Sequence, residues 1–344
     1  MKMKTKILYS IVVMIISLVS CTKENDTTNN NSTNNNTNTD STNITTNNYF
    51  DTGWQKKILP FGTNNAYIDI FFVDPLVGYT ASTDGIYKSI DGGNSWRKIY
   101  YTQGDLNLSA TKDGKVFIAS FTTDTLFRSF DYGETFSKLK LDSKGCDIYF
   151  PGKDTGYLTL QNSSVMQTID GGLNWSKVNP TTGLNLSPTG LIYTSFFQTG
   201  TTGWIAGASK VYKTNNSINS WTSSNFDIIP GIGYPIVIAS ISKDTVYLGA
   251  SVQGNTAFYN SVDGGLNFSL KKQFDSAGYN DISFINNHEG YINSLHSIYH
   301  TLNGGQSWEK VVSISDAQIS EIHFIDSNHG WACGTNGMIL LFKK

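Results

Sequence analysis

The sequence predicts an all-β protein, a seven-bladed β-propeller whose blades are four-stranded antiparallel sheets. Three observations predict this fold. An eight-residue segment recurs about every 40 residues, the same order of short strands surrounds each copy, and the two ends of the folded part hold complementary pieces of one blade. We expect the N-terminal strand to complete the last blade.

The recurring segment, which we call the box, has the pattern Ser/Thr-x-Asp/Asn-x-Gly-x-x-Trp/Phe. Its third positions are separated by 40, 39, 46, 47 and 40 residues, a regularity that chance does not produce. The copy at Asn216 lacks both glycines, so its spacing and Trp221 place it. The third positions and the closing tryptophans are Asp91, Asp131, Asp170, Asn216, Asp263, Asn303, Trp96, Trp175, Trp221 and Trp308.

The chemistry of the box is that of a hairpin turn. Its Ser or Thr ends one strand, and its Asp or Asn side chain can accept backbone N–H groups across the turn. Glycine supplies positive φ where other residues incur a steric cost, and the closing aromatic residue begins the next strand. We therefore interpret the box as structural, the alternative being a carboxylate cluster for metal binding or catalysis.

The box resembles the Asp-box, or bacterial neuraminidase repeat, of sialidase-like propellers. In the families that carry it, the Asp-box lies at the blade periphery and outside the active site. The resemblance implies a propeller fold and a structural role for the box.

Each box belongs to a common frame of four strands. An apolar strand comes first, a polar turn follows, a Gly-aromatic pair opens the second strand, and the box separates the third strand from the fourth. The first unit shows these features at Ile70 to Val73, Gly78-Tyr79 and Ile86 to Lys88. One such frame is one propeller blade.

The number of blades depends on the two ends of this array. A seventh frame begins at Glu321 and ends with the strand from Met338 to Phe342, without a box. Near the N-terminus, Trp54 to Ile58 is typical of the strand that follows a box. Because each end lacks what the other holds, we expect these two strands to pair and close the ring, which leaves no open sheet edge. Six blades with an appended strand is the alternative.

The first 20 residues are predicted to be a lipoprotein signal peptide. Three lysines precede an apolar run from Ile7 to Val19, which is short for a membrane span. The segment Leu18-Val19-Ser20-Cys21 resembles the lipobox of bacterial lipoproteins, which implies that Cys21 is lipidated and anchors the chain. An ordinary secretory signal is the alternative.

Residues 21–50 are predicted to be a disordered tether, which leaves residues 51–344 for the propeller. The tether is rich in Asn, Thr and Ser and offers little apolar surface to bury. Its stretch from Thr22 to Asp26 resembles the export signal of surface lipoproteins of Bacteroidota. We therefore predict an outer-membrane lipoprotein exposed at the cell surface, with the periplasmic face as the alternative.

Charge, cysteine and histidine content exclude several roles. Removing the three signal-peptide lysines leaves 22 basic and 27 acidic residues, a net charge of −5, with no basic run. We therefore expect no nucleic acid partner, and membrane contact only through the lipid anchor. Cys146 and Cys333 fall in different blades and are expected to be buried and unpaired. The histidines form no set typical of a metal site, so no metal or cofactor is expected.

Blade geometry divides the loops between two faces. The boxes and the turns between strands one and two share one face, and the links between blades share the other with the turns between strands two and three. Two links are long, roughly Asn179 to Leu191 and Thr222 to Pro235. The possible ligand residues on this second face are Tyr100, Tyr101, Phe226, Tyr234, Tyr279 and Asp281. The alternative is that these aromatic residues only seal blade junctions.

The residue counts argue against a sialidase. Sialidases hold the substrate carboxylate with three arginines, whereas this chain has only Arg97 and Arg128. Other glycosidases need only two carboxyl groups, for which Asp227 and Asp281 are candidates. Propeller hydrolases that degrade xyloglucan resemble this repeat but use two propellers. A hydrolase that acts on extracellular polysaccharide through an aspartate pair therefore stays open as the alternative function.

Over nearly the whole folded part, the chain resembles the photosystem II stability/assembly factor propellers of the HCF type. The best match is the run from Gly330 to Ile339, GWACGTNGMI. The resemblance implies a non-catalytic propeller that holds a partner protein, although two arginines cannot form the arginine patch of that family. We expect the fold and a binding role for an unknown protein or glycan to carry over, and not the photosystem.

Overall fold

The computed structural model describes residues 48–49, 52–59, 66–178, 192–207, 210–215, 218–224, 233–253, 255–274 and 281–344. All of them belong to one compact unit, Thr45–Lys344. The predicted signal peptide, Cys21 and most of the predicted tether lie outside the described residues. No helix long and apolar enough to cross a membrane occurs among those that are described.

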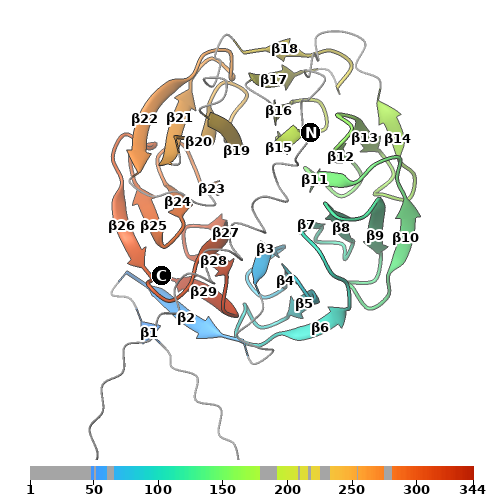
Figure 1. Ribbon diagram of the computed structural model, residues 1–344, viewed down its shortest axis with the longest axis horizontal. Helices are drawn as coiled ribbons and strands as arrows, with labels where there is room; N and C mark the ends of the chain where they lie inside the picture. Colours follow the sequence, from blue (N-terminus) through green and yellow to red (C-terminus); the bar gives the residue numbers. More distant parts are fainter. Residues whose placement is uncertain are drawn as a thin grey trace, which may run out of the picture. The chain divides into compact units, whose positions relative to one another are not determined.

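Seven antiparallel sheets are arranged around a central axis, as Figure 1 shows. Six sheets have four strands and the seventh has five, so the predicted seven-bladed propeller is confirmed. From the axis outward, blades 1 to 3 consist of β3 (Tyr67–Phe72), β4 (Gly78–Ser82), β5 (Gly85–Ser89) and β6 (Arg97–Tyr100); β7 (Leu106–Ala110), β8 (Val116–Ser120), β9 (Thr125–Ser129) and β10 (Ser137–Lys140); and β11 (Gly145–Tyr149), β12 (Gly156–Leu160), β13 (Val165–Thr168) and β14 (Ser176–Val178).

The remaining blades repeat the same order, and each again carries its first strand nearest the axis. Blades 4 to 6 consist of β15 (Ile192–Phe197), β16 (Gly203–Gly207), β17 (Lys210–Thr214) and β18 (Thr222–Ser223); β19 (Gly233–Ser240), β20 (Val246–Val252), β21 (Asn255–Ser261) and β22 (Ser269–Phe274); and β23 (Ile282–Phe284), β24 (Gly290–Ser294), β25 (Ser297–Thr301) and β26 (Glu309–Ser313). Blade 7 consists of β27 (Ile319–Asp326), β28 (His329–Gly334), β29 (Met338–Lys343), β2 (Trp54–Ile58) and β1 (Asn48–Tyr49).

Blade 7 closes the ring with strands from both ends of the unit. β2 pairs antiparallel with β29, from Trp54 opposite Phe342 to Ile58 opposite Met338, as the sequence predicts. The buried ammonium of Lys56 adds a 2.6 Å ion pair to Asp316. This closure removes the open edge that β29 would otherwise present to solvent.

Aromatic stacking joins most neighbouring blades. At five of the seven junctions, the aromatic residue in the second strand of one blade stacks on a Phe at or near the end of the first strand of the next blade. The pairs and their centroid distances are Trp331–Phe72 at 3.7 Å, Phe117–Phe150 at 4.3 Å, Tyr157–Phe197 at 3.7 Å, Tyr247–Phe284 at 3.7 Å and Tyr291–Phe324 at 4.0 Å. These buried rings form the core between blades.

The same Phe residues explain the Gly-aromatic pair of the sequence. In five blades the glycine that opens the second strand faces the ring of its own blade's Phe, so that a Cβ atom would overlap the ring. Blades 2 and 5 have Val116 and Val246 at this position, opposite the smaller Ala110 and Ser240. The glycine is therefore required by close packing.

Candidate functional site

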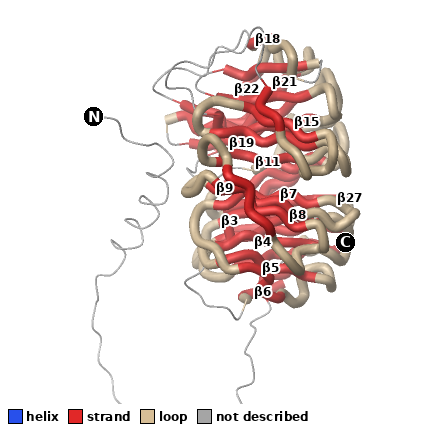
Figure 2. The backbone as a smooth tube through the Cα atoms, turned by 90° about the vertical axis from the view of Figure 1, so that its right-hand side faces the viewer, coloured by secondary structure: helices blue, strands red, loops and turns tan. Residues whose placement is uncertain are grey.

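The loops on the two faces of the ring differ in how closely they repeat from blade to blade. The box face carries the boxes and the turns between first and second strands, since box amides bond to the carbonyls of those turns, as in Gly171 to Asp154 and Gly264 to Asp244. The opposite face, which we call the link face, carries the links between blades and the hairpins between second and third strands. Figure 2 shows the strands of the ring from the side, running between the loops of these two faces.

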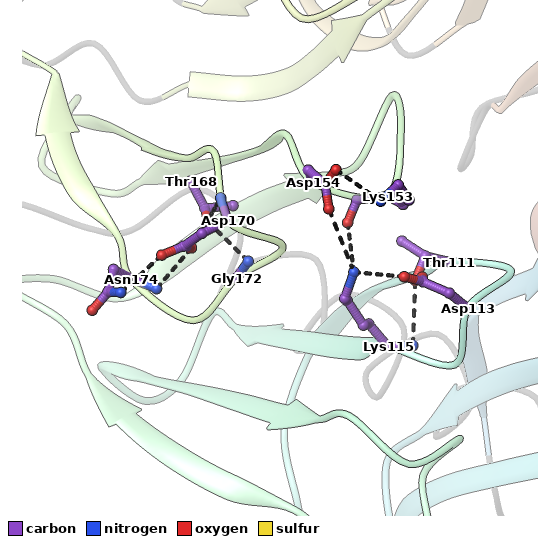
Figure 3. Close-up of polar contacts among 9 residues, drawn as sticks. All are labelled: Thr111, Asp113, Lys115, Lys153, Asp154, Thr168, Asp170, Gly172 and Asn174. Atoms are coloured by element: carbon purple, nitrogen blue, oxygen red, sulfur yellow. Dashed lines mark hydrogen bonds and ion pairs between the residues drawn. The ribbon is translucent and has the colours of Figure 1, made fainter.

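Box side chains bond within their own turn. In the third box, the Asp170 carboxylate accepts a hydrogen bond from the Thr168 hydroxyl at 2.8 Å and another from the backbone N–H of Asn174 at 2.9 Å (Figure 3). The Thr168 hydroxyl in turn accepts the N–H of Gly172 at 2.9 Å. The hydrogen bond from the backbone N–H of Asn174 has the largest effect, and with the side-chain bonds from Asn174 and Thr168 it lowers the pKa of Asp170 to about 2.

Lysines on the box face connect neighbouring blades. Lys115 of blade 2 reaches the carbonyl of Lys153 in blade 3 at 2.8 Å and also pairs with Asp113 (Figure 3). Lys213 reaches the carbonyl of Lys243 in the same way, at 2.7 Å. The polar groups of the box face thus serve its own architecture.

The described residues of the degenerate fourth box keep one feature of the box without glycine. Ile218 takes the place of the second glycine, at φ 66°, and its N–H donates to the Thr214 hydroxyl at 3.1 Å. A β-branched residue is strained in this region of φ. Its side chain is buried in the cluster that contains Tyr157 and Phe197, and this burial offsets the strain. Asn216 itself lies outside the described residues.

Exposed apolar side chains also recur on the box face. The second position of five boxes is a large apolar residue with 40–76 % of its surface exposed: Ile90, Phe130, Ile169, Val262 and Leu302. Each belongs to a different blade.

Four carboxyl groups face the axis from the first strands of their blades. Each begins the same short pattern, acidic residue-Ile-x-Phe: DIFF from Asp69, DIYF from Asp147, DISF from Asp281 and EIHF from Glu321. We call these four groups the axial carboxyls. All are half-buried, whereas the isoleucines that follow them are buried.

The axial carboxyls join neighbouring blades. Asp69 accepts the Leu108 N–H at 2.6 Å, Asp147 accepts the Ser195 N–H at 2.8 Å, and Asp281 accepts the Ile322 N–H at 3.2 Å. Each bond runs from one blade to the next around the ring. These groups therefore support the inner edge of the propeller.

Three of the axial carboxyls, Asp69, Asp281 and Glu321, also hold protons more tightly than free carboxyl groups do. Burial raises the pKa of Asp69 to about 7, and it raises the pKa of Asp281 to about 6. The pKa of Glu321 is raised by burial and by the neighbouring Asp281, to which it is hydrogen-bonded. The group of carboxyls thus shares protons near neutral pH.

The link face departs from the repeat at blade 5. There β20 and β21 have seven residues each, whereas the second and third strands of blades 1 to 4 and 6 have at most five. Their pairing begins at Val246 opposite Ser261 and continues to Val252 opposite Asn255. The two additional pairs extend this hairpin beyond the link face by about 7 Å.

Blade 1 carries a polar and aromatic cluster on the same face. Asp84, in the turn between β4 and β5, accepts the hydroxyls of Ser82 at 2.9 Å and Tyr87 at 3.0 Å. Lys98 of β6 pairs with the same carboxylate. Burial favours a higher pKa for Asp84, but the bonds from Lys98, Ser82 and Tyr87 outweigh it and lower the pKa. We call this group, together with Tyr101, the blade 1 cluster.

The six ligand residues predicted from the sequence differ in exposure and in their surroundings. Tyr101 is 81 % exposed, whereas Tyr100 packs against Phe127 and Phe136 at the junction with blade 2. Asp281 is one of the axial carboxyls. Phe226, Tyr279 and the side chain of Tyr234 lie outside the described residues, as does Asp227. The ligand role of these residues stays a prediction.

Histidine and cysteine side chains lie apart from one another. His296 bonds to the Ala317 carbonyl at 2.8 Å, and His323 bonds to the Phe72 carbonyl at 3.0 Å, where burial lowers its pKa to about 4. Cys146 and Cys333 are buried, as predicted. Within the described ranges, no three His, Cys, Asp or Glu side chains are grouped closely enough to bind a metal ion.

The sheets and the repeat together define the class of protein: a seven-bladed β-propeller whose blades carry a repeated box. A family model described as photosynthesis system II assembly factor YCF48 matches residues 134–273. The resemblance to photosystem II assembly-factor propellers is therefore confirmed. No curated protein matches the chain.

Solved structures share the fold at low sequence identity. A structure described as YCF48 bound to D1 peptide is 17 % identical, with 85 % of this chain and 97 % of that chain covered and a TM-score of 0.67. YCF48 from Cyanidioschyzon merolae is 18 % identical, with 84 % and 98 % covered and a TM-score of 0.64.

An enzyme is also among the similar structures. The GH74 xyloglucanase from Xanthomonas campestris is 15 % identical, with 83 % of this chain covered and a TM-score of 0.64. This chain corresponds to only 53 % of that enzyme. At these identities the comparison establishes the fold alone.

Proposed function

We propose that this protein is a non-catalytic binding propeller that holds a segment of a partner protein on its link face. The observation that carries the proposal is the difference between the faces. The box face repeats from blade to blade, whereas the extended hairpin of blade 5 belongs to the link face, where the two long links are also predicted to lie. In repeat proteins, insertions concentrated on one face commonly form the binding surface.

Similarity to known proteins supports a peptide-like ligand. The similar structure described as YCF48 bound to D1 peptide shares the propeller over 97 % of its length. This likeness supports a binding role for the fold, and the partner of this chain remains a separate question.

The proposal includes a lipid anchor at Cys21 and display outside the cytoplasm, at the outer membrane. Its support is the lipobox-like segment and the apolar run before it. Labelling of cells with an alkyne analogue of palmitate should mark the chain, and Cys21→Ser should abolish the label and release the protein from the membrane fraction. Labelling that survives Cys21→Ser would contradict the anchor.

A polysaccharide hydrolase is the alternative function, and one observation favours it. Asp281 and Glu321 are neighbouring carboxyls with raised pKa values, a feature of acid–base sites, on a fold shared with a xyloglucanase. However, glycosidases hold their two carboxyl groups at least about 5 Å apart, whereas these two are hydrogen-bonded to each other. The inter-blade bond of Asp281 is already a structural role.

A polysaccharide panel tests this alternative. Binding without turnover supports the proposed function. Turnover that is lost in both Asp281→Asn and Glu321→Gln, in variants that keep their thermal unfolding midpoint, would establish the hydrolase instead.

Site-specific photocrosslinking tests the protein-binding face. Gln253 lies at the exposed tip of the blade 5 hairpin, and Val262 is 76 % exposed on the box face of the same blade. With a photoreactive amino acid at each position in the full chain on living cells, we expect a discrete protein adduct from position 253 and none from position 262. Adducts from position 262 alone would contradict the assignment of the link face.

A further inference from the structure

The blade 1 cluster combines features that other blades carry singly. In blade 2, Lys140 pairs with Asp124 of the corresponding hairpin, and the ammonium groups of Lys138 in blade 2 and Lys310 in blade 6 lie 5.7 Å and 5.6 Å from the rings of Phe127 and Tyr299. Asp84 lies in the hairpin turn between β4 and β5, Lys98 lies in β6, and Tyr101 follows that strand. The corresponding hairpin of blade 5 has Gln253 at its tip, and that of blade 3 has Ser163. Among the described residues, no other lysine joins an ion pair to a ring as exposed as that of Tyr101, so ring architecture alone does not account for this combination.

The polar part of the cluster is electrically balanced. The side chains of Lys98 and Asp84 are 18 % and 34 % exposed, so both heads can be reached from solvent while they pair with each other. Hydroxyls of Ser82 and Tyr87 hold the carboxylate in place. An ammonium has three N–H donors and a carboxylate about four acceptor positions, so the pair retains capacity for further hydrogen bonds of both kinds.

The aromatic part is an exposed ring with a cation close to it. The side chain of Tyr101 is 81 % exposed. This is the largest exposed fraction among the exposed large hydrophobic side chains of the described residues. The ammonium of Lys98 lies 4.6 Å from its ring centroid and 5.0 Å from that of Tyr87. This cation–π contact orients the Tyr101 ring beside the ion pair.

A hydroxyl without a partner lies next to the cluster. Tyr67 is fully buried, its hydroxyl has no hydrogen-bond partner in the described part of the chain, and its ring meets that of Tyr87 at 5.6 Å. The charge of Asp84 acts on this hydroxyl as well. A buried polar group without a partner is uncommon away from functional sites.

We propose that the blade 1 cluster binds a neutral sugar unit of a glycan. Sugar rings present apolar C–H faces that stack on an exposed aromatic ring, and their hydroxyls both donate and accept hydrogen bonds, as Asp84 and Lys98 require. Asp84 would repel an anionic ligand, and Lys98 would repel a cationic ligand. The balanced ion pair therefore favours an uncharged ligand. This site adds a ligand to the proposed protein-binding function and occupies a different blade of the link face.

Binding of defined oligosaccharides tests the site. The full chain, in a detergent without a sugar headgroup, is titrated with neutral gluco-, xylo- and N-acetylglucosamine oligosaccharides, and with sulfated oligosaccharides as the anionic arm. We expect a neutral oligosaccharide to bind, and Tyr101→Ala to weaken this binding at least about tenfold, while Tyr101→Trp retains it. Because Tyr101 is exposed, its replacement should leave the thermal unfolding midpoint unchanged.

A matched control is available on the other face. Tyr132 is 48 % exposed with the ammonium of Lys88 5.6 Å from its ring, but it lies in a box. Tyr132→Ala should therefore bind the oligosaccharide as the parent chain does. Binding of the sulfated arm alone, equal binding by Tyr101→Ala, or no binding in any arm would overturn the sugar site. None of these results would alter the crosslink expected at position 253, which reports on the protein-binding function separately.

Discussion

The hydroxyl at the first position makes two of the hydrogen bonds that hold the box turn together. The Ser or Thr at its first position donates to the Asp or Asn at the third position and accepts the N–H of the fifth, and this pair of bonds recurs in five boxes. In the fourth box, the Thr214 hydroxyl still accepts the N–H of Ile218. The hydroxyl is therefore required even where both glycines are missing.

Thr168→Val tests the role of this hydroxyl. Valine has nearly the same shape, so the change removes the two bonds to Asp170 and Gly172 and leaves a buried N–H without a partner. We expect the free energy of unfolding to fall by about 1–3 kcal/mol, measured by denaturant titration. Thr123→Val, at an exposed turn position, is the matched control and should change it by less than about 0.5 kcal/mol.

The axial carboxyls make stability depend on pH in an unusual direction. The pKa values of Asp69, Asp281 and Glu321 lie above the ordinary values of 3.8 and 4.5, at about 7 for Asp69 and about 6 for Asp281. Between pH 4 and 7 the folded chain therefore holds protons that the unfolded chain has released. Stability falls as pH rises through this window.

Thermal unfolding at two pH values measures this effect. We expect a higher unfolding midpoint at pH 5.5 than at pH 8, and a smaller difference in Glu321→Gln, which removes one of the shared protons. Asp170→Asn is the control, since its pKa of about 2 lies outside the window and another box has Asn303 at that position. An unchanged pH difference in Glu321→Gln would refute the shared-proton description.

At the scale of the strand, the glycine that opens the second strand depends on the phenylalanine at or near the end of the first. Gly156 opens β12 because the ring of Phe150, at the end of β11, fills the space that a side chain would need. The same Phe150 stacks on Phe117 of blade 2 at 4.3 Å. Packing within a blade and packing between blades therefore depend on the same side chain.

A double-mutant cycle measures this dependence. Phe150→Ala with Gly156→Val reproduces the pair Ala110 and Val116 that blade 2 uses at the same register. Each single change should destabilise the chain, by about 3–5 kcal/mol for Phe150→Ala. The double variant should be more stable than the sum of the two predicts, by about 1–3 kcal/mol. Strict additivity would show that the two side chains do not share this space.

The elements themselves could be predicted because the box fixes their order. Its position between the third and fourth strands follows from turn chemistry, which depends on adjacent residues. The acidic residue-Ile-x-Phe pattern was also readable in the sequence, at Asp69, Asp147, Asp281 and Glu321. The role of these carboxyls could not be predicted, because the hydrogen bonds of the three aspartates run to residues of the following blade, about 40 positions away.

At the scale of the whole molecule, the ring and its two faces follow from repetition, but the sites do not. Seven blades and their closure could be predicted from complementary ends. The extended hairpin of blade 5 and the blade 1 cluster could not, because they depend on strand lengths and turn positions that only the folded sheets determine. Tyr101 was predicted as a ligand-face residue from its loop position, without its neighbours Asp84 and Lys98.

Ring closure decides which loops share a face, and hence where any ligand binds. If β2 pairs with β29, the link face and the box face are assigned as described, and the free edge of blade 7 is covered. Lys56 and Asp316 then lie together at this junction, with the ammonium buried.

Amide hydrogen exchange over residues 54–58 tests this closure most directly. Paired as in the structure, these amides should exchange as slowly as those of residues 338–343, and the amides of 338–343 should exchange faster when residues 1–59 are deleted. Fast exchange over 54–58 in the full chain, with 338–343 still protected, would contradict a closed seven-bladed ring and the face assignment that depends on it.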